Sequence, residues 1–129
     1  MIKFRIVSAR LAFAAVLLGA AAMSPARAQD ATAGEKVFKS QCSICHTVAA
    51  GKNLVGPSLF PIVGRKAGQV PGFRYSAANR DSALTWDQAT LDRYLLNPRA
   101  AVPGTTMTFT GVKSDEQRRD LIAYLASVR

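Results

Sequence analysis

The sequence predicts an all-α fold, and three features of the chain lead to that prediction. Three stretches carry apolar residues at helical spacing, and no stretch alternates apolar and polar residues as a half-buried strand would. Gly and Pro punctuate the segments between the helices and make them unusually long loops. Because long ordered loops in a small domain need something to wrap around, we expect a helical frame that holds loops against a bound group.

Two of the predicted helices lie early and midway in the chain. The first should span residues 31–40, with Asp30 or Thr32 as its N-cap. The second should follow Thr85, which lies three residues before a glutamine as in a capping box, and should end at Asn97 because a proline comes next. The side chains that this second helix should turn inward are Leu91, Tyr94 and Leu95.

The C-terminal helix has the clearest pattern of the three. Ser114 and Gln117 have capping-box spacing, and the two acidic residues between them suit the positive end of the helix dipole. Apolar side chains then recur at helical spacing and form one stripe, which we expect to face the core: Leu121, Ile122, Tyr124, Leu125 and Val128.

The first 28 of the 129 residues differ from the rest of the chain. A basic start precedes an apolar run, residues 11–22, which is shorter than the roughly 20 residues that span a bilayer. The small-x-small pattern ending at Ala28 is typical of a signal-peptidase site, although an uncleaved membrane anchor or a buried helix is the alternative. We expect a signal peptide at 1–28, cleavage after Ala28, a periplasmic location and one domain at 29–129.

Basic residues outnumber acidic ones. Four of the 17 Lys and Arg residues lie in the expected signal peptide, so 13 remain against 8 acidic residues and the formal charge falls from +9 to +5. The remaining cations are scattered and form no Lys/Arg-rich run, which argues against nucleic-acid binding. The excess charge would steer the protein toward an acidic protein face, and solubility alone explains it about as well.

Cys42-Ser43-Ile44-Cys45-His46 is the C-x-x-C-H signature of c-type haem attachment. The two thiols can add to the haem vinyl groups, and the histidine that follows can reach the iron. A zinc site would need a fourth ligand outside the motif, a thioredoxin-type redox pair should lie beside a βαβ pattern, and a disulfide this short would constrain little. We therefore expect one haem c, bound covalently through Cys42 and Cys45.

The second axial ligand of the iron has few candidates. Without the signal peptide, Met107 is the only methionine and His46 the only histidine, which leaves His/Met ligation, His/Lys ligation or a vacant position. Met107 lies in a polar, turn-rich stretch, residues 103–109, where a thioether has no obvious core role. We favour Met107 as the ligand. With both axial positions filled, the protein should carry single electrons and should not be an enzyme.

Several further blocks of sequence follow the C-x-x-C-H motif in a fixed order, and together they are more specific than any one motif. They are Gly56-Pro57-Ser58-Leu59, Gly64-Arg65-Lys66-Ala67-Gly68, Pro71-Gly72-Phe73-Arg74-Tyr75-Ser76-Ala77-Ala78-Asn79, Thr85-Trp86, Tyr94-Leu95-Leu96-Asn97-Pro98, Pro103-Gly104-Thr105-Thr106-Met107 and Asp120-Leu121-Ile122-Ala123-Tyr124-Leu125. In this order they resemble class I cytochromes c of the mitochondrial type and their bacterial periplasmic relatives. The resemblance implies crossed N- and C-terminal helices with loops wrapped around one haem, and a soluble electron carrier in a respiratory or photosynthetic chain.

The resemblance also implies roles for residues around the axial ligands. The carbonyl of Pro57 would accept the Nδ1–H of His46, which fixes the ring and raises its basicity. Tyr94 would point toward the sulfur of Met107, with Thr105 nearby.

Other residues gain roles around the haem itself from the same resemblance. A cation and neutral donors would surround the propionates and make two buried carboxylates tolerable: Arg65, Tyr75, Asn79 and Trp86. Phe109 would cover the haem edge. The crossing of the first and last helices would be made by Gly34, Phe38, Leu121 and Tyr124.

The chain departs from the family where lysines usually surround the haem edge. Gln41, Thr106 and Arg99-Ala100 stand at positions that often carry lysine, whereas Lys113 keeps one matching charge. We therefore expect weaker electrostatic steering toward a mitochondrial-type oxidase than in lysine-bearing relatives. Because lysines near the Met loop can replace Met as ligand at high pH, we also expect Met107 to stay bound to higher pH than in lysine-bearing relatives.

The resemblance implies redox proteins as partners. A cytochrome bc complex would donate electrons, and a terminal oxidase or a photosynthetic reaction centre would accept them; we expect a monomer with only peripheral membrane encounters and no nucleic acid. A haem enzyme or gas sensor with an open sixth position is a second hypothesis, against which Met107 argues. A bound electron-entry subunit of one dehydrogenase is a third.

Overall fold

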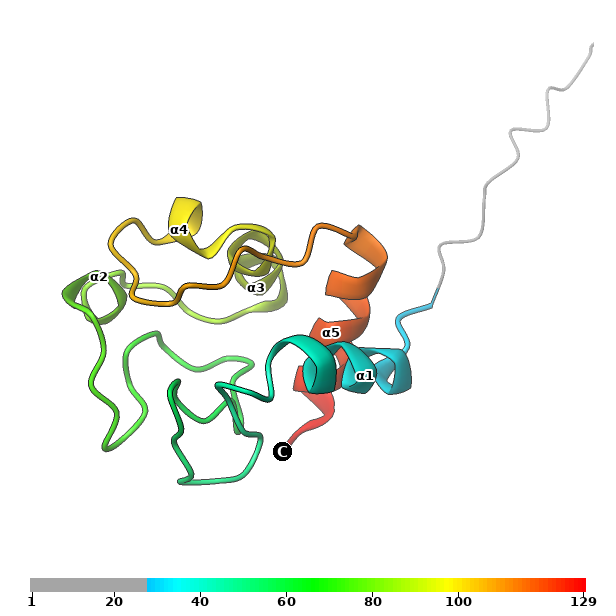
Figure 1. The fold of residues 1–129 in the computed structure, drawn as a ribbon, viewed down its shortest axis with the longest axis horizontal. Coiled ribbons are helices and arrows are strands. Elements are labelled where there is room, and N and C mark those ends of the chain that lie inside the picture. The colour runs from blue at the N-terminus through cyan, green and yellow to red at the C-terminus, as the bar shows by residue number, and fades with distance from the viewer. Residues whose placement is uncertain (1–27) are drawn as a thin grey trace, which may run out of the picture.

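The computed structural model describes residues 28–129, so the expected signal peptide lies, but for its last residue, outside the described part. Within residues 28–129 the helices are α1 (Ala31–Gln41), α2 (Ala77–Arg80), α3 (Gln88–Leu96), α4 (Pro98–Ala101) and α5 (Asp115–Ser127). Figure 1 shows α1 crossing α5 on one side of the molecule, α2 to α4 on the other, and long loops between α1 and α2. An isolated antiparallel bridge joins Lys66 and Thr85. The all-α prediction is confirmed.

The crossing of α1 and α5 is close because α1 carries a glycine at the contact. A Cβ at Gly34 would overlap the backbone carbonyl of Asp120, so only glycine allows this approach. The rings of Phe38 and Tyr124 lie 5.5 Å apart beside it, and the backbone N–H of Asp30 donates to Oδ1 of Asp120 at 2.9 Å. The expected crossing of the N- and C-terminal helices is therefore present.

A buried arginine ties α5 to α3 and to the loop between them. The side chain of Arg118 is 5% exposed, and its Nε and Nη2 donate to Asp92 at 2.9 Å and to Asp115 at 2.7 Å. Its Nη1 also donates to the backbone carbonyls of Val112 at 3.0 Å and Lys113 at 3.2 Å. The hydrogen bond to Asp92 is the main reason why the pKa of Arg118 lies above the ordinary value for arginine. This one side chain thus holds three segments together.

The capping residues match the sequence prediction in part. Asp30 caps α1 and Ser114 caps α5, as predicted, whereas Thr32, the alternative cap of α1, only donates its backbone N–H to Asp30. The expected cap of α3, Thr85, is wrong. Asp87 caps α3 instead, because Thr85 is held in the bridge to Lys66 and its backbone is not free to open a helix.

The ends of the helices, and the side chains that α5 buries, can be compared with the sequence prediction. α3 ends at Leu96 with Asn97 as its C-cap, which agrees with the predicted stop before Pro98. The same asparagine is the N-cap of α4, a short helix that was not predicted. α2 was also not predicted; Ser76 caps it. On α5, Tyr124 is half-buried and Val128 is the C-cap, so the fully buried part of the predicted stripe is Leu121, Ile122 and Leu125.

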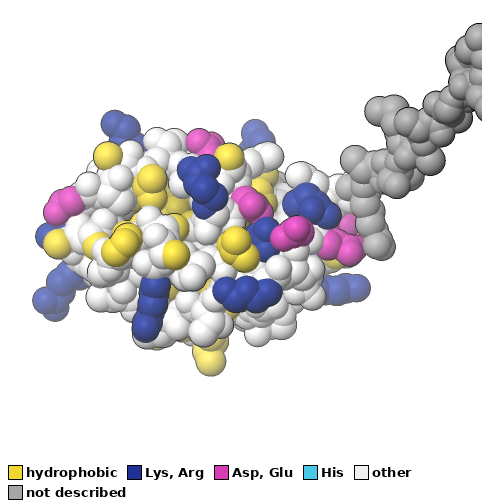
Figure 2. All heavy atoms as spheres, turned by 90° about the horizontal axis from the view of Figure 1, so that it is seen from above, with side chains coloured by type: hydrophobic (Ala, Val, Ile, Leu, Met, Phe, Trp, Pro, Cys, Tyr) yellow, Lys and Arg dark blue, Asp and Glu magenta, His cyan; other side chains and the backbone are white. Residues whose placement is uncertain are grey.

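The face of the described residues that Figure 2 shows has no single dominant patch of charge. Figure 2 shows Lys and Arg side chains distributed over the visible face, with apolar side chains scattered between them. The most exposed large apolar side chains are Ile44 and Val55, at 83% and 78%. Among residues 28–129, no helix has both the length and the apolar character that crossing a membrane requires.

Candidate functional site

A cavity of about 360 Å³ lies between the end of α1, α3, α5 and the long loops. This volume is within the range of pockets that bind small molecules and cofactors. The structure brings every predicted site residue to its wall: Cys42, Cys45, His46, Pro57, Arg65, Tyr75, Asn79, Trp86, Tyr94, Thr105, Met107 and Phe109. Their roles toward a bound group remain predictions at this point.

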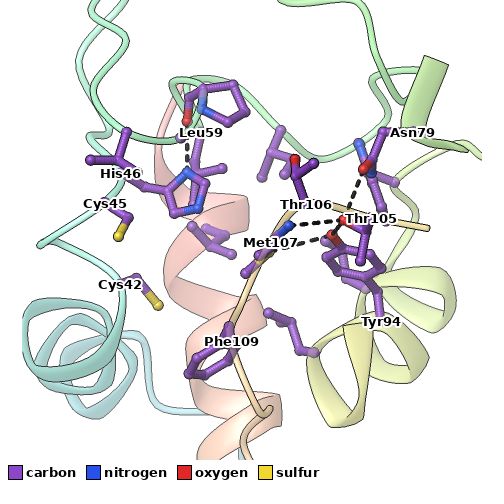
Figure 3. Close-up of a pocket in the computed structure, with 18 of the residues that line it drawn as sticks. Cys42, Cys45, His46, Leu59, Asn79, Tyr94, Thr105, Thr106, Met107 and Phe109 are labelled. Carbon is purple, nitrogen blue, oxygen red and sulfur yellow. Dashed lines mark hydrogen bonds between the residues drawn. The ribbon is translucent and has the colours of Figure 1, made fainter. Parts of the chain in front are cut away.

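The two cysteines lie in a tight turn directly after α1. The N–H groups of Cys45 and His46 both donate to the carbonyl of Cys42, at 3.0 and 2.9 Å, and this turn brings both side chains to the same wall of the cavity (Figure 3). Both are free cysteines. In the chain without haem, burial, together with the neighbouring Cys45, raises the pKa of the Cys42 thiol to about 11, so the thiol is neutral at neutral pH.

His46 is buried and its ring is held by one backbone carbonyl. Nδ1 lies 2.8 Å from the carbonyl oxygen of Pro57, and since a carbonyl only accepts, Nδ1 carries the proton and Nε2 keeps its lone pair. Burial lowers the pKa of His46, although the bond to Pro57 opposes this effect. A Cβ at Gly56 would overlap the imidazole ring, so glycine makes room for it. The result is a neutral imidazole ready to bind a metal.

Met107 faces His46 from the other side of the cavity (Figure 3). The hydroxyl of Tyr94 donates to Sδ of Met107 at 3.3 Å and lies 3.5 Å from Oγ1 of Thr105. That same Oγ1 accepts from the N–H of Met107 at 3.3 Å and donates to Oδ1 of Asn79 at 2.8 Å. The thioether is therefore oriented by a hydrogen-bond network that reaches two other segments.

These residues fit a haem bound through two thioether bonds. The two thiols and the imidazole share one wall, a thioether lies opposite, and the remaining wall is mostly apolar, as a porphyrin ring requires. The zinc alternative finds less support, because in residues 28–129 no group of three or more His, Cys, Asp or Glu side chains is arranged so that it could hold a metal ion.

Comparisons with known proteins agree with this chemistry. The family model described as Cytochrome c matches residues 31–129. The chain is 50% identical to cytochrome c2 of Rhodomicrobium vannielii over 98% of this chain and 94% of that one, and 49% identical to cytochrome c2 of Blastochloris viridis over 82% and 84%. The chain belongs to the cytochrome c family. The structure of cytochrome cH from Methylobacterium extorquens superposes with a TM-score of 0.70 at 47% identity, covering 74% of this chain and 96% of that one.

Membership of the cytochrome c family confirms three predictions. The fold is that of class I cytochromes c, the cofactor is one covalent haem c, and the protein is an electron carrier. Electron carriers of the cytochrome c family are generally not enzymes. Cys42 and Cys45, with C-x-x-C spacing, are the two cysteines available for the haem.

Three residues predicted near the haem propionates also have partners within the chain of this cytochrome c, and their role toward the propionates stays a prediction. The guanidinium of Arg65 donates to three loop carbonyls, and burial lowers its pKa; the hydroxyl of Tyr75 accepts from the N–H of Val70 at 3.3 Å. The ring of Trp86 packs edge-on against Tyr94 with centroids 4.8 Å apart. The three carbonyls bound by the arginine are those of Ser58, Phe60 and Pro61.

The sequence prediction missed part of the wall of the haem pocket. Two of the missed residues, Leu59 and Ile62, lie in loops, where apolar residues follow no period that could mark them. Four more lie on helical stripes that the sequence did show, although their contact with a cofactor was not predicted: Leu91, Leu95, Leu121 and Leu125.

Proposed function

We propose that this protein is an exported carrier of single electrons whose iron is bound axially by His46 and Met107. The observation that supports this most is their placement on opposite sides of one cavity, next to the two thiols of the C-x-x-C-H motif. Haem, when bound, supplies an iron that gains and loses one electron. Everything else in the proposal concerns what the chain does around it.

The chain would hold both ligands in place during each electron transfer. Pro57 accepts from Nδ1 of His46 and keeps Nε2 directed into the cavity, and Tyr94 donates to the sulfur of Met107. Because both ligands are fixed by bonds already present, little has to rearrange when the charge changes. An imidazole and a thioether together, in an apolar pocket, favour a raised reduction potential. Filled axial positions also leave no easy site for oxygen or peroxide, so we propose that the chain is not an enzyme.

We propose further that the chain is exported with cleavage after Ala28 and works in the periplasm, with residues 29–129 as the mature domain. The basic start, the apolar run and the small-x-small pattern of residues 1–28 support this. A cytochrome bc complex as donor, and a terminal oxidase or photosynthetic reaction centre as acceptor, suit a carrier with a raised potential. We propose that it acts as a monomer and meets membranes only at their surface.

Replacing the thioether tests the axial assignment. Met107→Ala should abolish the sulfur–iron absorption band of the ferric protein and let the ferrous protein bind carbon monoxide at neutral pH. The parent protein should show the band and should not bind carbon monoxide. The matched control is Thr106→Ala, which removes an exposed side chain next to Met107 and should change neither property.

Two results would overturn the proposal. Carbon monoxide binding by the parent protein at neutral pH would indicate an open sixth position, and hence a haem enzyme or gas sensor. A sulfur–iron band that survives Met107→Ala would show that another group is the ligand.

A further inference from the structure

One peptide group connects the axial histidine to a side chain outside the haem pocket. The carbonyl of Pro57 accepts from Nδ1 of His46 at 2.8 Å, and the N–H of the same peptide group, that of Ser58, donates to Oδ1 of Asn53 at 2.9 Å. The two hydrogen bonds therefore lie on opposite ends of one planar amide. Asn53 itself does not line the cavity.

The orientation of the Asn53 amide is determined by its partners. Its Oδ1 faces a backbone N–H, which only donates, and its Nδ2 lies 3.1 Å from the carbonyl oxygen of Pro71, which only accepts. Exchanging oxygen and nitrogen would place donor against donor and acceptor against acceptor. Asn53 is half-buried and Ser58 is 1% exposed, so water competes little for the bond between them.

We propose that Asn53 is a positioning residue for His46 and acts through the Pro57–Ser58 peptide group. When Oδ1 of Asn53 accepts the hydrogen bond from the Ser58 N–H, it polarises the peptide group, and the Pro57 carbonyl at the other end becomes a stronger acceptor. A stronger acceptor on Nδ1–H increases electron density on the imidazole and its basicity as a ligand. Asn53 would thus lower the reduction potential, since a more basic ligand stabilises the more positive iron. The inference rests on the proposed function in one respect, that His46 is an axial ligand.

A purely structural role for Asn53 is the competing explanation. Its two hydrogen bonds join the loop at residues 53–58 to the turn at Pro71, and losing this connection could loosen both segments without any effect on the imidazole. The test must therefore include a measurement on the His46 ring itself and a variant that loosens the same loop by another route.

The holoprotein and three variants separate the two explanations. Asn53→Ala removes both bonds of the side chain, and Asn53→Asp keeps an acceptor for the N–H of Ser58 while losing the donor to Pro71. Ser58→Ala is the matched control: it removes the bonds that its hydroxyl makes to Ala49 and Phe60 but keeps its backbone N–H. The measurements are the reduction potential, the Nδ1 proton resonance of His46 in the ferrous protein, and hydrogen exchange of the Ser58 amide.

For Asn53→Ala we expect a higher reduction potential, an upfield shift of the His46 Nδ1 proton and about fivefold faster exchange at Ser58. Asn53→Asp should leave this resonance at or downfield of its parent position, and Ser58→Ala should leave the resonance and the potential unchanged. Equal resonance shifts in the Ala and Asp variants, or an unchanged resonance in Asn53→Ala, would overturn the inference. If the parent protein lacks the large upfield ring-current shift of the His46 ring protons, the proposal that His46 is an iron ligand is wrong, whatever the Asn53 variants show.

Discussion

Replacing Arg118 by methionine should destabilise the protein substantially, although the arginine does not line the haem pocket. The side chain makes four hydrogen bonds, two to carboxylates and two to backbone carbonyls, and is 5% exposed. Arg118→Met keeps the length of the stem, so apolar packing is largely preserved while all four bonds are lost. The cost then depends on what each former partner can do without the guanidinium.

The magnitude follows from the exposure of the partners. Asp92 and Asp115 have side chains 42% and 75% exposed, so both regain water, and each lost pair costs about 0–1 kcal/mol. The carbonyl of Val112 belongs to a residue that is 2% exposed, and a buried acceptor without a partner costs about 1–3 kcal/mol. We therefore expect Arg118→Met to lower the free energy of unfolding by about 1–5 kcal/mol.

Guanidinium-induced unfolding of the holoprotein measures this cost, with the fluorescence of Trp86, the single tryptophan, as the signal. Arg119→Met is the matched control, because the neighbouring arginine on α5 is exposed, and it should change the free energy by less than about 0.5 kcal/mol. A buried ion pair can also be replaced by apolar residues at no cost. If Arg118→Met behaves like its control, that principle applies here and the argument from the Val112 carbonyl is wrong.

Three further predictions concern backbone strain, helix capping and ligand exchange. Ala83 has a positive φ of 52°, so Ala83→Gly should raise the free energy of unfolding by about 0.5 kcal/mol in the same assay, the relief of strain being partly offset by the freer unfolded chain. Hydrogen bonds from Thr90 lower the pKa of Asp87. The Asp87 carboxylate therefore stabilises α3 fully above the ordinary carboxyl pKa, and this stabilisation is lost as the pH falls through the lowered pKa. Asp87→Asn should thus flatten the acid side of the curve of unfolding free energy against pH. Thr106→Lys should lower the pH at which the sulfur–iron band of Met107 disappears, and an unchanged midpoint would contradict the idea that missing lysines protect this ligand.

The helical frame could be predicted from the sequence because its signals are local. Ser114 accepts from an N–H three residues along the chain, and the α5 stripe needs only its own periodicity. The cap of α3 was mispredicted for a non-local reason: Thr85 is fixed by Lys66, 19 positions earlier, which no spacing around Thr85 reveals. The helices α2 and α4 have four residues each, too few for any apolar period to appear.

The sequence narrows the candidates for the two proposed iron ligands, whereas the residues that support these candidates depend on contacts between distant loops. One histidine and one methionine remain after the expected signal peptide, which makes His46 and Met107 the candidates of their kind, and the polar loop around Met107 favours it over a lysine or a vacant position. Asn53 has no such signal, because asparagine in a loop is ordinary and its partners are backbone groups whose positions depend on the fold. A side chain that hydrogen-bonds a peptide group can act on a ligand through that group, and the residues that supply the peptide group can be of any type. Its role therefore depends on geometry and becomes visible only when the hydrogen bonds on both ends of that peptide group are known.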